Sequence, residues 1–550
     1  MTDPEVLVAG GGPAGLACAV FLAQKGVAVT LVERHEGTLI HPRARTINPR
    51  TAELLRQAGV EEEVLAARTY VGEMPSVVML KVETLAGKEL HRAEQRPPAG
   101  AEGAQRVGPS NWGMIDQDRL ENLLRARAVE LGADVRFGTA LAGFTQDSGG
   151  VTATLEDRAS GRTYEVRARY LVGADGHHST VRALLGVGVE GPGPISQVAS
   201  MVFDADLTLP LRGRHDPARD RFIASCHFTV PAEGTVMFPH GADHRWVFNT
   251  PHDGEPGEDA CVELVRAAVG VPDLDVRLVP QLANGVKVLT YEIAAQVARR
   301  FRDGRVFLAG DAAHVMPPAG AFGAGTGIQD AHNLAWKLHA VLSGRAGPGL
   351  LDSYEEERRP VAEFTLGQAL HQLRLRSGVE VAAPEAEPVE YDAVVFGYRY
   401  RSRVICGADP GGPPAVPPRE LTGAPGTRAP HLPVRRGGRD ISTLDLYGED
   451  HVLLAGPGAR EWARAARALD VRLVRVGDGD AVRGDVVADA ERWASAHGVS
   501  PSGALLVRPD GFVAWRARED GGPAGAAGET LAGVLARVTC RAPAILNRQS

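Results

Sequence analysis

The sequence predicts an α/β protein of several domains, and three observations support this expectation. The chain has 550 residues, which is more than one hydrophobic core usually holds, so two or three domains are expected. Its first 35 residues have the pattern of a strand, a glycine-rich turn, a helix and a second strand. Two later segments, near residues 170 and 310, again place Gly and Asp directly after short apolar runs.

The first of these units predicts a dinucleotide site. Gly10 allows a tight turn after the strand at 6–9, Gly12 lets a pyrophosphate approach the backbone, and Gly15 lets the helix at 14–24 pack close to the strand. Glu33 ends the second strand, where its carboxylate can accept hydrogen bonds from ribose hydroxyls. The cofactor-binding residues predicted here are Gly10, Gly12, Pro13, Ala14, Gly15, Glu33 and Arg34.

Composition narrows the class of protein. The net charge of -8 argues against nucleic acid as a partner. Residues 6–23 carry no charge, but acidic residues precede them and glycines interrupt them, so we expect a cytoplasmic protein without a membrane segment. The five cysteines are odd in number and form no CxxC pair, which favours a reducing compartment and no metal site.

The two later segments extend the prediction from a dinucleotide to FAD. Asp175 and Asp311 each lie at the end of an apolar run beside a glycine turn, and such an Asp can accept from a sugar-like hydroxyl. The glycine-rich loop at 320–327 leads into a helix expected at 326–342, with Thr326 and Gln329 as a capping box. A helix N-terminus suits the negative charge of a reduced flavin.

In this order and spacing, the three segments resemble the class A flavoprotein monooxygenases, the p-hydroxybenzoate hydroxylase and phenol hydroxylase group. The resemblance covers the whole chain and adds site residues. It implies that Arg43 lies near the pyrophosphate, Arg45 near the isoalloxazine ring, and the side chain of Gln117 against the cofactor. It also implies that Asp175 serves both FAD and NAD(P)H, and that Asp311 binds the ribityl chain.

Three more segments, 398–402, 425–430 and 508–516, look like those of aromatic polyketide hydroxylases, which carry a C-terminal thioredoxin-like domain. The fold implied is a Rossmann-like FAD-binding domain with an inserted mostly-β substrate domain, plus a C-terminal thioredoxin-like α/β domain. Since residues 431–541 contain Cys540 as their one cysteine, that domain is expected to be redox-inert. The expected boundaries are 1–75, 110–195 and 290–380 for FAD binding, 76–109 and 196–289 for substrate binding, 381–430 for a linker, and 431–550 for the thioredoxin-like domain.

Some segments depart from the family pattern or invite a simpler interpretation. The family's usual Asn in the glycine-rich loop is replaced by Gly325, so a more mobile loop is expected, although the backbone donors of Gly323, Ala324 and Gly325 remain. His314 is interpreted as a structural histidine rather than a base. The charged run at 355–359 is expected to be an exposed helix face.

The resemblance implies a monooxygenase with non-covalent FAD, using NADPH or NADH and O2 to hydroxylate a small aromatic molecule, of polycyclic polyketide type, through a flavin C4a-hydroperoxide. Arg45 and Pro318 are the candidate catalytic residues, and no residue is required as a base. His227, Phe238 and His240 are the candidate substrate residues, in an apolar wall that includes Met237. Open alternatives are a Baeyer–Villiger or epoxidising enzyme, and a non-enzymatic flavin-fold interaction protein. A homodimer is also left open.

Overall fold

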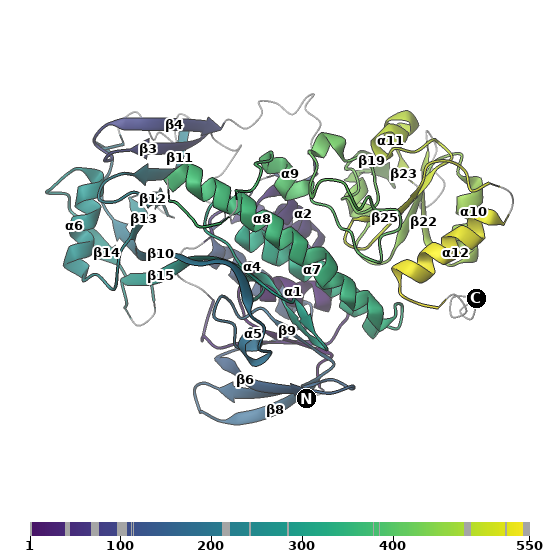
Figure 1. Ribbon diagram of the computed structural model, residues 1–550, viewed down its shortest axis with the longest axis horizontal. Coiled ribbons are helices and arrows are strands. Elements are labelled where there is room, and N and C mark those ends of the chain that lie inside the picture. Colours follow the sequence, from purple (N-terminus) through teal and green to yellow (C-terminus); the bar gives the residue numbers. More distant parts are fainter. Residues whose placement is uncertain are drawn as a thin grey trace.

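The structure is a computed structural model of the chain. It describes residues 3–38, 44–67, 76–95, 107–111, 113, 115–211, 221–240, 244–282, 285–377, 379–383, 385–477, 486–522 and 525–542. Four sheets organise these residues, and Figure 1 shows their arrangement. The described helices include none that combines the length and the apolar character needed to cross a membrane.

A six-stranded sheet forms the first layer. Its order is β16-β17-β9-β1-β2-β5, and the five strands from β17 to β5 are parallel. Because both faces of such a sheet are covered, its central strands are continuous apolar runs, and β1 and β9 are completely buried. The strands are β1 (Val6–Ala9), β2 (Val29–Glu33), β5 (Asp134–Phe137), β9 (Tyr170–Gly173), β16 (Arg302–Asp303) and β17 (Val306–Leu308).

Helices pack against this sheet and form the largest hydrophobic cluster with it. Helix α1 follows the glycine-rich turn, and its apolar residues from Gly15 to Ala23 are all buried. Asn48 caps α2 because its side chain accepts from the Thr51 backbone N–H, at 2.9 Å. The helices of this part are α1 (Pro13–Gln24), α2 (Pro49–Gln57), α3 (Glu61–Ala66), α4 (Gln117–Glu130), α5 (Thr180–Leu184), α7 (Gly323–Leu342) and α8 (Ser353–Ser377).

The sequence pattern predicts one strand over 165–172, and the structure corrects this to two. Strand β8 (Thr163–Ala168) joins β6 (Thr139–Gln146) and β7 (Val151–Asp157) in a three-stranded antiparallel sheet, whereas β9 belongs to the parallel sheet. The chain changes sheets at Arg169, where two successive N–H groups, those of Arg169 and Tyr170, donate to the one carbonyl of Glu5. A continuous strand-like pattern in the sequence does not reveal such a change of partner.

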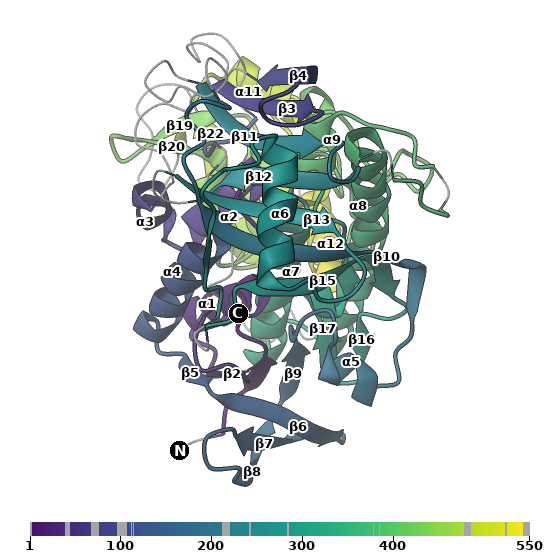
Figure 2. The same cartoon turned by 90° about the vertical axis from the view of Figure 1, so that its left-hand side faces the viewer.

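A nine-stranded sheet forms the second layer. Its path is β18-β15-β10-β13-β12-β11-β3-β4, with β14 paired to β10. Helix α6 (Glu258–Val269) crosses one face of this sheet, as Figure 2 shows, and closes a second core around Met237, Phe248 and Cys261. The strands are β3 (Ser76–Val82), β4 (Glu89–Gln95), β10 (Val189–Asp204), β11 (Arg221–Phe228), β12 (Thr235–Pro239), β13 (Arg245–Pro251), β14 (Arg277–Val279), β15 (Val288–Ala298) and β18 (His314–Val315).

The C-terminal part is a separate seven-stranded sheet in the order β20-β19-β23-β22-β21-β24-β25. Two apolar clusters, one containing Trp493 and the other Trp462, pack on this sheet. The mixed α/β fold class expected from the sequence is therefore confirmed. The elements are β19 (Pro433–Arg436), β20 (Arg439–Ser442), β21 (Val452–Ala455), α10 (Arg460–Ala468), β22 (Arg472–Gly477), β23 (Val486–Val487), α11 (Ala490–His497), β24 (Ala504–Val507), β25 (Val513–Ala517) and α12 (Ala526–Val538), preceded by α9 (Tyr391–Phe396).

A buried set of four charges joins this C-terminal part to α7 and α8, which lie between it and the nine-stranded sheet in Figure 1. Arg508 donates to both oxygens of Glu357, at 2.6 and 2.8 Å, and also pairs with Asp510. Lys337 donates to Glu357 at 2.8 Å. Burial opposes the charged form of Glu357, but Arg508 and Lys337 outweigh it and hold its pKa well below the usual range. The same burial lowers the pKa of Lys337 to about 8.

The expectation that residues 355–359 form an exposed helix face is wrong for two of them. The side chains of Glu357 and Arg358 are completely buried. Arg358 donates to Asp330 at 2.7 Å and to the hydroxyl of Tyr400 at 3.1 Å. The partners of Glu357 and Arg358 are distant in the sequence. The local run of charged residues alone therefore predicts an exposed helix face.

Two buried histidines predict how stability changes with pH. Burial lowers the pKa of His332 to about 3 and that of His497 to about 4. Between about pH 6.5 and 5 the unfolded chain protonates both and the folded chain does not, so each lowers the free energy of unfolding by about 1.4 kcal/mol per pH unit. Urea unfolding across this window measures the slope. We expect His497→Gln to reduce it by one histidine's share, and an unchanged slope would contradict this assignment.

Candidate active site

The three segments singled out in the sequence meet at the carboxyl ends of β1, β9 and β17. The Ala174 N–H donates to the Ala9 carbonyl at 2.7 Å, and the Ala309 N–H donates to the Gly173 carbonyl at 2.9 Å. The packing is close enough that a Cβ on Gly10, whose φ is +113°, would lie 2.2 Å from the Ala174 carbonyl oxygen. In open α/β sheets, ligands bind at this edge of the parallel strands.

The turn before α1 fits a pyrophosphate. A Cβ on Gly15 would lie 2.0 Å from the Gly10 carbonyl oxygen, so this glycine is needed for helix packing. Gly12 differs, because a Cβ there would meet no atom within 4 Å in the part of the chain that the structure describes. Gly12 is the N-cap of α1 and brings no side-chain cap, and Pro13 follows at the start of the helix. The start of α1, at Ala14, therefore has room for an anion to accept hydrogen bonds from the free N–H groups of the first helical turn.

Glu33 lies beside this turn at the end of β2. One carboxylate oxygen accepts from the Gly11 N–H at 2.6 Å, and the other accepts from the His35 N–H at 2.9 Å. Burial favours the neutral acid, but these hydrogen bonds and the His35 side chain outweigh it and lower the pKa of Glu33. An ionised acceptor thus stands where a ribose is expected. Arg34 is exposed, and the predicted Arg43 lies outside the described residues.

Asp175 and Asp311 have different surroundings. Asp175 accepts from the Ser179 hydroxyl and from the Val181 N–H, at 3.0 Å, so its carboxylate orders the start of α5. Asp311 lies in the short 3-10 turn Gly310–Ala312, and its side chain is exposed. Of the two, Asp311 has the carboxylate more open to a ligand hydroxyl.

Beneath this turn lies a buried charge that sequence reasoning missed. Asp330 accepts from the Gly310 N–H at 3.1 Å, from His314 at 2.6 Å and from Arg358 at 2.7 Å. Burial opposes its ionisation, but His314 and Arg358 outweigh that and lower its pKa. This arrangement supports the structural interpretation of His314. The only signal for Asp330 is that it is the one acidic residue of α7.

Helix α7 begins earlier than the sequence suggests. It starts at Gly323, and the Thr326 hydroxyl bonds back to the Phe322 carbonyl at 2.9 Å, so the predicted capping box is wrong. Gly323, Ala324 and Gly325 form the first turn of the helix, so their N–H groups are those of its N-terminus. Gly325 is required here for packing, because a Cβ would lie 2.8 Å from both Asn48 and Thr51 of α2.

Restoring the family's usual residue with Gly325→Asn is expected to lower flavin affinity. The new side chain would displace the Asn48 cap of α2, and a lost cap costs about 1 kcal/mol before any clash is counted. Flavin content and melting temperature of the purified variant measure this. The outcome that contradicts it is a variant with unchanged flavin content and stability; the control is Gly528→Ala in α12, where a Cβ meets no atom of a described residue within 4 Å and no cofactor contact is expected.

Arg45, Phe238 and His240 are brought together, and Asp116 joins them. Arg45 donates to Asp116 at 3.0 Å, and its guanidinium carbon lies 5.0 Å from the centre of the Phe238 ring. His240 Nδ1 lies 3.6 Å from the other Asp116 oxygen. Burial favours the neutral form of Asp116, but His240 and Arg45 outweigh it and lower its pKa. Gln117 links Ala44 to α4, since its side chain accepts from the Ala44 N–H at 3.3 Å.

Asp116 was missed because its position suggests an ordinary helix N-cap. In the structure it occupies the N-cap of α4, but its side chain does not cap the helix. Several buried polar atoms on this side of the nine-stranded sheet have no hydrogen-bond partner among the described residues, and such atoms call for a ligand or ordered water. They are Arg45 Nη2, Asp116 Oδ2, Ser200 Oγ, His240 Nδ1 and Asn249 Oδ1.

The remaining candidates lie around this cluster. His227 pairs across the sheet with Val236 and therefore shares a face with Phe238, and burial lowers its pKa to about 4. Met237, expected in the same wall, points to the opposite face and is buried in the core beneath α6, because side chains alternate along a strand. Pro318 is exposed and makes no contact with the cluster in the described hydrogen bonds or ring contacts.

Comparisons with known proteins agree with this architecture. Residues 3–369 match the family model described as "FAD binding domain", and residues 422–542 match "Aromatic-ring hydroxylase, C-terminal". A tetracenomycin B2 monooxygenase-dioxygenase of Streptomyces olivaceus is 42% identical, with 98% of both chains covered. A 4-methyl-5-nitrocatechol 5-monooxygenase of Burkholderia sp is also 42% identical, over 97% of this chain and 98% of the relative.

A solved structure gives the same result for the fold. The complex of aklavinone-11 hydroxylase with FAD and aklavinone superposes with a TM-score of 0.87 at 37% identity, covering 98% of this chain and 100% of that chain. The chain therefore belongs to the family of FAD-dependent aromatic-ring hydroxylases.

Proposed function

We propose that the cluster of Arg45, Asp116, Phe238 and His240 is the place where an aromatic substrate meets the flavin ring of FAD, with NADPH or NADH as the electron donor. The observation that carries this proposal is Asp116. It is a helix N-cap whose side chain does not cap the helix but pairs with Arg45, and its second oxygen lies 3.6 Å from Nδ1 of His240, which likewise has no closer partner among the described residues. A buried group of this kind is costly unless a ligand completes it.

Bound FAD would supply the activation of O2 and the transfer of an oxygen atom. The residues of the chain hold and polarise the substrate. Because Asp116 is ionised and faces Nδ1 of His240, the other ring nitrogen of His240 is free to accept a hydrogen bond from a phenol hydroxyl. That bond increases electron density on the substrate ring. The Phe238 ring, which lies beside Arg45, helps exclude water from the reaction.

For the substrate we propose a fused-ring phenol of the polyketide type. The names of two relatives refer to tetracenomycin B2 and aklavinone, which supports this class, whereas the name of a third refers to a single-ring nitrocatechol. Comparative turnover of polycyclic and single-ring phenols separates these two substrate classes. Tri- and tetracyclic phenols should couple NAD(P)H oxidation to hydroxylated product more efficiently than single-ring catechols, and the reverse order would overturn the polycyclic assignment.

A matched pair of variants tests the cluster. His240→Asn should keep FAD bound but lower kcat for hydroxylation by at least about 100-fold, the lower end of the range expected when a positioned proton acceptor is lost. Hydrogen peroxide should rise as product falls. The control is His244→Asn, since His244 is exposed in the same hairpin and its φ of +69° suits asparagine. Equal losses in both variants would contradict the proposed role.

A further inference from the structure

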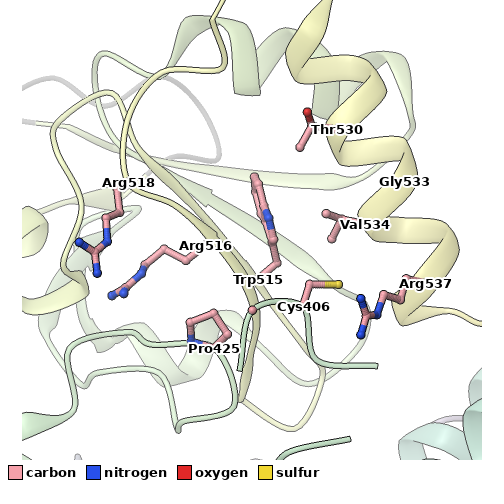
Figure 3. Close-up of a pocket in the computed structure, with 10 residues that line it drawn as sticks. Cys406, Pro425, Trp515, Arg516, Arg518, Thr530, Gly533, Val534 and Arg537 are labelled. Carbon is pink, nitrogen blue, oxygen red and sulfur yellow. The ribbon is translucent and has the colours of Figure 1, made fainter. Parts of the chain in front are cut away.

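A second site lies in the C-terminal part, separate from the cluster around Asp116. It is a cavity of about 600 Å³ between strand β25, helix α12 and the segment that precedes β19. Figure 3 shows it, with the Trp515 ring between Arg516 on one side and Arg537 on the other. The lining side chains that matter here are Trp515, Arg516, Arg518, Thr530 and Arg537.

The three arginines give the cavity an uncompensated positive charge. Arg516 donates to the carbonyls of Thr422 and His497, at 2.6 and 3.2 Å, and Arg537 donates to the carbonyl of Arg403 at 2.9 Å. Carbonyl partners fix the guanidinium groups without neutralising them. No carboxylate of a described residue forms an ion pair with Arg516, Arg518 or Arg537, whereas other arginines of the same C-terminal part, such as Arg464 and Arg508, have such a partner. The site is therefore built to attract an anion.

The aromatic ring in the cavity limits what the anion can be. Trp515 is half-buried and is held on β25 opposite Leu506, with Trp462 packed edge-on at 5.0 Å. A fixed indole between cations can stack against a flat ring. A bare inorganic ion would leave most of the cavity empty, whereas pockets of about 300–1,000 Å³ are typical for small organic ligands.

We propose that this cavity binds a phosphate monoester carried on a flat ring, the chemistry of a nucleoside monophosphate. The arginines bind the phosphate, the indole stacks on the base, and the Thr530 hydroxyl is available to the sugar or phosphate. The same chemistry occurs in a free nucleotide and in the adenosine 2′-phosphate end of NADPH. The inference does not depend on the proposed function, because it concerns binding alone.

Calorimetric titration of the FAD-loaded protein with AMP tests this proposal. Saturable binding is expected with Kd at or below about 1 mM, and inorganic phosphate should bind at least about tenfold more weakly. Arg518→Gln and Trp515→Leu should each weaken AMP binding by about tenfold, while Arg439→Gln, on exposed strand β20, should not change it. Melting temperatures check that the variants fold.

Three results would overturn the proposal: no saturable binding of AMP, equal binding of AMP and inorganic phosphate, or unchanged AMP binding by both cavity variants. The last would place AMP at the flavin or nicotinamide site instead. Displacement of AMP by NADPH and not by NADH would identify the reduced cofactor as the source of the phosphate. If AMP binds and NADPH does not displace it, the ligand is a free nucleotide.

Discussion

Replacing Gly12 by valine is expected to give a folded protein that does not retain FAD. A Cβ at Gly12 meets no atom of a described residue within 4 Å, and its φ of −78° is open to any L-residue, so the fold should tolerate the change. The added methyl groups would occupy the space where a pyrophosphate approaches the start of α1. We expect FAD affinity to fall by at least about a hundredfold, which corresponds to about 2.7 kcal/mol. The flavin absorbance of the purified protein and titration of the apoprotein with FAD measure this.

Gly10→Val is the comparison variant, because it should lose FAD for a different reason. At Gly10 a Cβ would lie 2.2 Å from a backbone oxygen, and φ is +113°, so this variant should lose the fold together with the cofactor. The two variants should therefore differ in circular dichroism and protease resistance although neither is yellow. A yellow Gly12→Val protein with normal FAD affinity would mean that the pyrophosphate binds elsewhere.

The second large effect is expected at Glu357. Glu357→Gln removes the shared partner of Arg508 and Lys337 and leaves two buried cations with Asp510 alone. Breaking a buried ion pair from one side typically costs about 3–5 kcal/mol. We expect a clearly lower melting temperature and earlier proteolysis between α8 and the C-terminal sheet, since the lost contacts join those parts.

Glu356→Gln is the matched control, one residue away on the same helix. Glu356 pairs with Arg403 at the surface, where 29% and 57% of the two side chains are exposed. Exposed pairs are worth about 0–1 kcal/mol, so this variant should be nearly as stable as the wild type. If both variants were equally stable, the buried charges would not hold the C-terminal part in place.

The sequence predicts those parts of the molecule that depend on local chemistry. Gly10, Gly12 and Gly15 follow from the geometry of a strand–turn–helix, and Glu33 follows from its place at the end of the next strand. The site at Asp116 could not be predicted in this way, because a lone Asp before a helix usually caps it. Here tertiary contact with Arg45 and His240 replaces the capping bond.

The errors have a similar cause. The single strand expected over 165–172 divides where the chain exchanges one set of neighbours for another. Glu357 and Arg358 were assigned to solvent because their partners, Arg508 and Asp330, are far away in sequence. Met237 was placed in the substrate wall because the alternation of β12 had not been assigned to faces. The domain boundaries and the roles of the site residues remain predictions.

The four-charge set also has a consequence for building chimeras from related enzymes. Its members come from both sides of a junction: Lys337 and Glu357 from the helices, Arg508 and Asp510 from the C-terminal sheet. A chimera that exchanges only the C-terminal part would keep two of the four charged residues. The other two positions would carry the residues of the donor enzyme. Such hybrids should express well only when α7, α8 and the tail are inherited together, so the natural crossover point lies before α7 rather than in the Pro- and Gly-rich segment near residue 410.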